Sequence, residues 1–126
     1  MLVDTDVLIW SFRGRESARA AIDEASPVAL SIITYMELVQ GVHNKVELQR
    51  LRASIRTQDW QIAGLTEEVG ARATTYVEAY ALSDGLGLAD ALIAATATLR
   101  GDALLTGNTR HYRCIPGLVL VSYVPD

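Results

Sequence analysis

The sequence predicts a three-layer α/β/α fold with a mainly parallel sheet, and two observations carry this prediction. Short apolar runs without strict alternation recur along the chain, as in strands that are buried on both faces. Stretches with helical spacing separate these runs, so strands and helices alternate, and the crossovers should be right-handed. A length of 126 residues suits one domain spanning 1–126.

The expected strands are all short, and helical segments lie between them. Each run is too apolar to have one face in water, which favours a position inside the sheet. The strands are expected at residues 2–3, 28–33, 60–63, 103–105 and 119–121.

Four helices are clear from spacing and from their end signals. "TEEVGARATTYVEAYALSDG" has Thr66 as an N-cap and Gly85 as a stop. "LADALIAATATLRG" is almost wholly apolar after Asp90, which predicts a buried helix that ends at Gly101. "ESARAAIDEA" and "VELQRLRASIRT" are expected to form more exposed helices.

Composition and charge argue against several classes of protein. No stretch approaches the ~20 apolar residues of a membrane span, and Met1 leads into an apolar run without a basic signal region. We therefore expect a cytoplasmic protein without membrane contact. The single cysteine, Cys114, excludes an internal disulfide and a cysteine-based zinc site. A net charge of -4 argues against nucleic-acid binding over a broad positive face, so any such contact is local.

Two carboxylates interrupt the first apolar run, "MLVDTDVLIW". Asp4 leaves the first strand at its carboxyl end, where sites form in parallel sheets, but Asp4 and Asp6 also suit the cap of a following helix. A third interpretation is a phosphatase of the haloacid dehalogenase type, which also presents D-x-D after a strand. That chemistry needs a lysine after a strand, and the only lysine, Lys45, lies in a polar segment.

Three further polar residues follow later strands or begin later helices. Thr34 and Glu37 have the spacing of a capping box, which would explain Glu37 without any chemistry. Asp90 lies among apolar neighbours, where a buried carboxylate needs a partner. Asn108 follows the fourth strand and can cap the next helix or offer a neutral oxygen to a metal.

Together these residues predict a metal site. Three carboxylates brought to one end of the sheet repel one another unless a cation neutralises them. Oxygen ligands without a useful histidine or cysteine set favour Mg²⁺ or Mn²⁺ over zinc. Such a site activates water and stabilises charge on a phosphodiester, which is the chemistry of a metal-dependent nuclease.

The segments "LVDTDVLI", "SIITYMELVQG", "GLGLADALIAATA" and "LLTGNTRHYRCIPGL" resemble PIN-domain ribonucleases of the VapC toxin type over nearly the whole chain. The resemblance implies a five-stranded sheet in the order 3-2-1-4-5 and an acidic pocket for Mg²⁺ or Mn²⁺. It assigns Asp4, Glu37 and Asp90 as metal ligands and catalytic residues. Asn108 falls on a fourth catalytic position that is often acidic, so a second metal would be held weakly.

Several other residues receive supporting roles from the resemblance. Thr106 is the hydroxyl residue that members often place beside the fourth position, and Asp6 is either an outer-shell ligand or a cap. Because an acidic pocket repels RNA, positive groups should rim it. The candidates for this RNA contact are Arg13, Arg15, Arg110, His111 and Arg113.

The resemblance also implies partners and a biological role. The protein would cleave tRNA, rRNA or mRNA and so inhibit translation and growth. A VapB-like antitoxin would cover the pocket, the toxin would form homodimers and higher assemblies with it, and DNA would be bound only through the antitoxin. The alternative, to which Asn108 points, is a catalytically degenerate PIN-like module that binds RNA or protein.

Overall fold

A computed structural model describes residues 1–126, and its centre is a sheet of five parallel strands. The strand order is β3-β2-β1-β4-β5, which confirms the predicted fold class and order. The strands are β1 (Leu2–Val3), β2 (Ala29–Ser31), β3 (Gln61–Ala63), β4 (Leu104–Thr106) and β5 (Leu120–Ser122).

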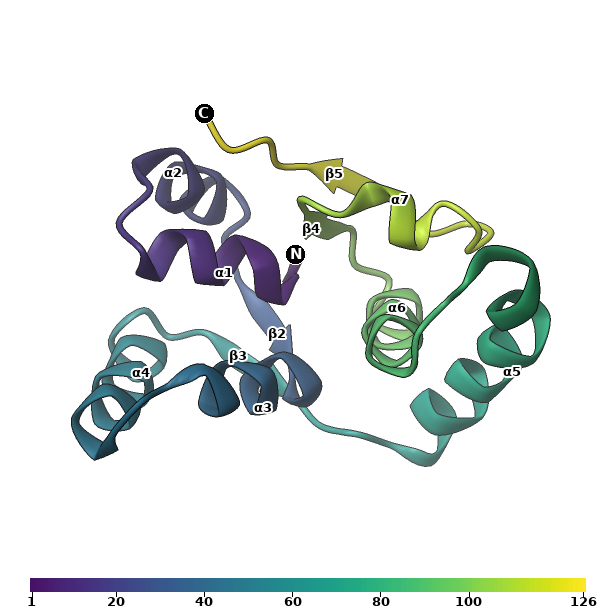
Figure 1. Ribbon diagram of the computed structural model, residues 1–126, viewed down its shortest axis with the longest axis horizontal. Coiled ribbons are helices and arrows are strands. Elements are labelled where there is room, and N and C mark those ends of the chain that lie inside the picture. The colour runs from purple at the N-terminus through teal and green to yellow at the C-terminus, as the bar shows by residue number, and fades with distance from the viewer.

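Seven helices surround this sheet (Figure 1). In the figure the first four lie to the left and the next two to the right, with the short α7 above α6. The helices are α1 (Thr5–Phe12), α2 (Glu16–Glu24), α3 (Ile32–Gly41), α4 (Lys45–Thr57), α5 (Glu67–Asp84), α6 (Leu88–Arg100) and α7 (Thr109–Tyr112).

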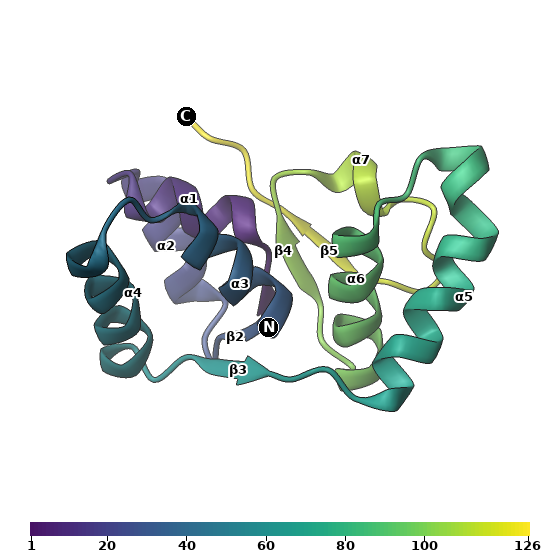
Figure 2. The same cartoon turned by 60° about the horizontal axis from the view of Figure 1, so that its bottom comes forward.

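The two faces of the sheet carry separate cores. Leu2 pairs in register with Ala29 and Leu104, and these three side chains belong to the core under α5, α6 and α7. Val3 pairs with Leu105 and belongs to the other core, under α1 to α4. Alternate residues of β1 therefore bury opposite faces, as the period of a strand requires. The two helical layers stand apart in Figure 2.

The second strand is shorter than the sequence predicts, because the helix after it begins earlier. We expected a strand over 28–33, but Ile32 and Ile33 are the first residues of α3. The Ser31 side chain accepts a 3.0 Å hydrogen bond from the Ile33 backbone N–H and so caps the helix. β4 and β5 each begin and end one residue later than expected.

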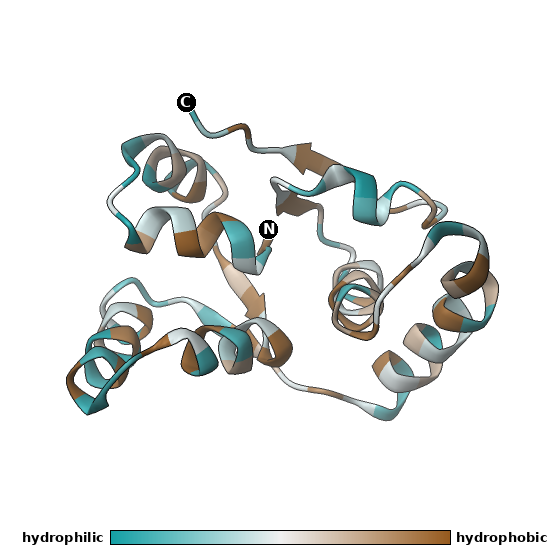
Figure 3. Ribbon diagram, in the orientation of Figure 1, coloured by the Kyte–Doolittle hydropathy of each residue, from teal (hydrophilic) through white to brown (hydrophobic).

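Three helix ends predicted from sequence, at Thr66, Gly85 and Gly101, are confirmed. Thr66 accepts a 3.1 Å hydrogen bond from Val69 N–H as the N-cap of α5. Gly85 and Gly101 follow α5 and α6 in the left-handed region, at φ 68° and 69°, which glycine adopts without a steric penalty. In Figure 3 the strands are mostly brown, whereas α4 alternates brown and teal, as an exposed amphipathic helix does. The helices here are all too short or too polar to cross a membrane.

Candidate metal centre

Asp4 lies at the carboxyl end of the central strand, and its carboxylate is almost fully enclosed. The residue is 4% exposed. Oδ1 accepts a 2.9 Å hydrogen bond from Thr5 N–H, so Asp4 is also the N-cap of α1. Oδ2 accepts hydrogen bonds from the hydroxyls of Thr106 at 2.8 Å and Tyr112 at 3.0 Å. The predicted helix cap is confirmed for Asp4, and the second carboxylate oxygen is bound by hydroxyl groups at the edge of the sheet.

Asp90 reaches the same place from the first turn of α6. The Tyr112 hydroxyl that contacts Asp4 lies 3.2 Å from Asp90 Oδ1. Asp90 Oδ2 lies 3.1 Å from His111 Nδ1. Two aspartates that are remote in sequence therefore meet at one phenol group, and a half-exposed imidazole lies at the outer side of Asp90.

Glu37 joins the network through α1, and its predicted capping role is wrong. Helix α3 begins at Ile32, so Thr34 and Glu37 lie inside it and no capping box forms. Thr5 Oγ1 donates a 2.7 Å hydrogen bond to Glu37 Oε1 and lies 3.0 Å from Thr34 Oγ1. Thr5 therefore touches Asp4 through its N–H and Glu37 through its hydroxyl.

The segment after β4 is fixed by two hydrogen bonds at the same edge of the sheet. Thr106 Oγ1, which donates to Asp4, accepts a 2.9 Å hydrogen bond from Asn108 N–H. Asp6 Oδ2 accepts a 2.9 Å hydrogen bond from Gly107 N–H, and its Oδ1 accepts one of 2.9 Å from Val7 N–H. Asp4 is the N-cap of α1, but Asp6 also satisfies a donor in the first turn of that helix. Asn108 occupies the N-cap position of α7, but its exposed side chain makes no capping hydrogen bond.

The electrostatics of this edge favour a cation. Burial, and secondly the charge of Asp6, raise the pKa of Asp4 from 3.8 to about 6, although hydrogen bonds from Thr106 and Thr5 oppose the shift. Burial likewise raises the pKa of Asp6, against hydrogen bonds from Gly107 and Val7. No Lys or Arg forms an ion pair with either carboxylate.

The donor set fits Mg²⁺ or Mn²⁺. The groups at the edge are carboxylate and hydroxyl oxygens, which hard divalent cations prefer, and Mg²⁺ commonly uses only one or two carboxylates with water or phosphate as the other ligands. Asp4 and Asp90 supply that minimum. No three His, Cys, Asp or Glu side chains are grouped closely enough to hold an ion by themselves, and Glu37 stays with Thr5.

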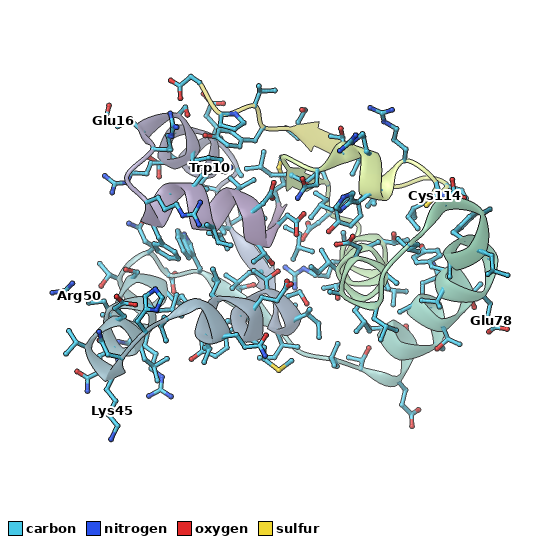
Figure 4. All side chains as sticks on the ribbon, viewed as in Figure 1. Trp10, Glu16, Lys45, Arg50, Glu78 and Cys114 are labelled. Carbon is cyan, nitrogen blue, oxygen red and sulfur yellow. The ribbon has the colours of Figure 1, made fainter.

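The positive residues expected at the rim divide into two groups. Arg13 and Arg15 follow the far end of α1, roughly 13 Å along the helix axis from Asp4, where their guanidinium carbons lie 5.8 and 5.0 Å from the Trp10 ring centre. Trp10 is labelled in Figure 4. Arg15 also pairs with Asp126. Arg110 and Arg113 are exposed on and just after α7, in the segment that carries His111.

Tyr112 is the site residue that the sequence did not reveal. It is 1% exposed and contacts both aspartates. Burial, together with the charges of Asp4 and Asp90, raises its pKa above the ordinary value, so it stays a neutral phenol. Its place after Asn108 in "NTRHYRC" carries no spacing signal, because the contact depends on how α7 packs against the sheet.

Comparison with known proteins agrees with this architecture. The sequence pattern of the PIN domain matches residues 1–114. The chain belongs to the PIN-domain family, which removes the phosphatase alternative.

Individual relatives point to one branch of that family. The chain is 37% identical to Ribonuclease VapC10 of Mycobacterium tuberculosis, over 89% of this chain and 85% of that protein. It is 31% identical to Ribonuclease VapC19 of the same organism, over 93% and 95% of the two chains. Among solved structures, a toxin-antitoxin complex from Klebsiella pneumoniae aligns with a TM-score of 0.84 and 32% identity, covering 99% of this chain and 98% of that one.

Proposed function

We propose that this protein is a Mg²⁺- or Mn²⁺-dependent endoribonuclease and the toxin of a toxin-antitoxin pair. The observation that carries the proposal is the convergence of Asp4 and Asp90 on Tyr112 at the carboxyl edge of the sheet. The similarity to two proteins named ribonucleases supports RNA as the substrate. We place the reaction in the cytoplasm and in one domain spanning 1–126.

The residues at the edge take separate roles in this proposal. Asp4 and Asp90 would hold the cation, and Glu37 would join them directly or through water with the carboxylate oxygen that Thr5 does not occupy. Asn108 contributes an amide oxygen, and Thr106 keeps Asp4 oriented through its hydroxyl. Asp6 acts outside the ligand set, because its hydrogen bond to Gly107 fixes the loop that precedes Asn108.

A cation held by these residues would supply Lewis-acid chemistry, which would lower the pKa of a water molecule and offset charge on the scissile phosphate. The chain itself contributes binding and orientation. Arg110 and Arg113 are exposed on and just after α7, the helix that carries Tyr112, and are suited to hold the RNA backbone, since guanidinium groups pair well with phosphate. Arg13 and Arg15 lie further away, where they would contact only a longer RNA.

The partners of the proposed toxin follow from its relatives. The Klebsiella pneumoniae structure is a toxin-antitoxin complex, so we propose a VapB-like antitoxin for this chain. A homodimer, and higher assemblies with the antitoxin, belong to the same proposal. We propose contact with DNA only through the antitoxin.

The test is cleavage of total cellular RNA by purified, antitoxin-free protein with Mg²⁺ or Mn²⁺, and again with EDTA. We expect discrete fragments that depend on the metal. Asp90→Asn should abolish them, whereas Asp23→Asn, which removes the same charge from an exposed position on α2, should leave them unchanged.

Two results would contradict the proposal. Cleavage by Asp90→Asn at the wild-type rate would show that the activity does not use this site or comes from a contaminant. Absence of cleavage with either ion, with RNA binding retained, would favour the alternative of a degenerate binding module.

A further inference from the structure

The Tyr112 hydroxyl is the only group that contacts both Asp4 and Asp90 within hydrogen-bond distance. The two aspartates belong to different elements, the end of β1 and the first turn of α6. No backbone hydrogen bond joins those two positions, so this phenol is their direct link.

The ring of Tyr112 packs in the core, whereas its hydroxyl contacts the two carboxylates. Tyr112 is 1% exposed, and its ring packs in the core with residues such as Leu104 and Ile115. Phenylalanine would fill the same space. Only the hydroxyl reaches the two carboxylates, so its role can be separated from packing by removing one oxygen atom.

Hydrogen-bond accounting shows which aspartate depends more on the phenol. A phenol has one proton, which it shares between two carboxylates. Asp4 keeps two other donors, Thr5 N–H and the Thr106 hydroxyl. Asp90 has only one other contact, with His111, whose side chain is 50% exposed. Without the hydroxyl, the Asp90 side chain loses its buried anchor.

We infer that Tyr112 is a positioning residue whose hydroxyl holds Asp90 beside Asp4 for binding of the divalent cation. The inference rests on the proposed metal-dependent function. If both carboxylates are already held in place, cation binding does not have to include the entropy loss of immobilising their side chains, and the affinity is higher. Groups that orient metal ligands in this way typically change metal affinity by about 10- to 100-fold when they are removed.

The test is Mn²⁺ binding by isothermal titration calorimetry to the wild type, Tyr112→Phe and Tyr76→Phe. Tyr76 is a matched control, because it is also buried in the same core and its hydroxyl contacts Thr98 Oγ1 at 3.3 Å, away from the carboxylates. We expect Tyr112→Phe to bind Mn²⁺ about 10- to 100-fold more weakly and Tyr76→Phe to bind like the wild type.

RNA cleavage gives a second readout. Tyr112→Phe should need more Mn²⁺ for half-maximal cleavage but recover near-wild-type kcat at saturating Mn²⁺, which a variant with a damaged fold would not do. Wild-type Mn²⁺ affinity in Tyr112→Phe, or an equal loss in Tyr76→Phe, would overturn the positioning role while leaving the proposed function intact. Absence of Mn²⁺ binding and of cleavage in the wild type would overturn both.

Discussion

Thr5 Oγ1 donates a 2.7 Å hydrogen bond to Glu37 Oε1, and this contact ties the first turn of α1 to the middle of α3. The same hydroxyl contacts Thr34, which is fully buried. One side chain therefore supports an acidic residue of the proposed site and satisfies a polar group of the core.

Replacing this hydroxyl should cost both stability and activity. Thr5→Val keeps the shape but leaves the Thr34 hydroxyl without its partner, so we expect the free energy of unfolding to fall by about 1–3 kcal/mol. RNA cleavage should fall as well, because Glu37 loses its anchor. Urea unfolding and cleavage assays measure the two effects. Thr5→Ser, which keeps the hydroxyl, should retain both properties, and equal losses in the two variants would contradict this role.

The raised pKa of Asp4 makes the stability of the metal-free protein depend on pH. Its pKa is 3.8 when unfolded and about 6 when folded, so folding favours the neutral acid. The associated stability is fully present below about pH 3.8 and is lost as the pH rises through about 6. In EDTA, Asp4→Asn should therefore gain stability relative to the wild type between pH 4 and pH 7.5, by up to about 3 kcal/mol.

Denaturant unfolding at several pH values measures that difference. The two proteins are compared by how their free energies of unfolding change with pH. A comparison at one pH would also include the effect of changed hydrogen bonding at position 4, because the Asp4→Asn amide disturbs the hydrogen bonds from Thr106 and Tyr112. A pH-independent difference between the two proteins would contradict the raised pKa. Mg²⁺ or Mn²⁺ should raise the wild-type Tm at pH 7.5 and leave that of Asp4→Asn unchanged.

Gly107 lies so close to the Asp6 carboxylate that any side chain at this position would clash with it. A Cβ there would clash with Asp6 Oδ2 and approach the Tyr123 carbonyl oxygen to 3.3 Å. We expect Gly107→Ala to displace the Asp6 carboxylate and to lower stability by about 1–3 kcal/mol. Gly70→Ala, inside α5 with open space around it, should instead raise stability by about 0.5–1 kcal/mol. Thermal unfolding of both variants checks this, and equal shifts would contradict it.

Asn108→Asp tests whether a carboxylate at the fourth catalytic position, where this chain has an amide, strengthens the proposed metal site. The backbone of Asn108 is held to Thr106, which in turn contacts Asp4, so an added carboxylate would lie near the proposed metal ligands. More ligand charge tightens divalent-cation sites, and we expect the Mg²⁺ concentration for half-maximal cleavage to fall on the order of tenfold. Magnesium titration of the cleavage rate measures this. An unchanged titration would show that the residue 108 side chain lies outside the ligand set.

The sheet and most helix ends could be predicted because their signals are local. Thr66, Gly85 and Gly101 end their helices through side-chain capping or a left-handed φ, and both effects depend on one residue and its neighbours. The start of α3 was missed because two caps competed. Ser31 and Thr34 are both good caps by residue type, and the extended backbone at Ser31 decides between them.

The site was less accessible to sequence reasoning, because its contacts depend on packing. Acidic residues at a strand end and near a helix start predicted that Asp4 and Asp90 belong to one edge, and the structure brings both to Tyr112. Neither the tyrosine bridge nor the link from Thr5 to Glu37 has a spacing rule. Both arise where helices from different parts of the chain dock against the same sheet.

The hydrogen bonds of the site have a consequence for folding kinetics. Asp4 meets Thr106 and Tyr112 across 102 and 108 residues, and Asp6 meets Gly107 across 101. Contacts between residues so far apart in sequence are expected to form late in folding. The chain must lose the entropy of closing a long loop before these contacts can stabilise it. The acidic edge therefore assembles only when the two ends of the fold dock. Because Leu104 and Leu105 of β4 lie in the two separate cores, the acidic edge should come apart only with unfolding of the whole domain.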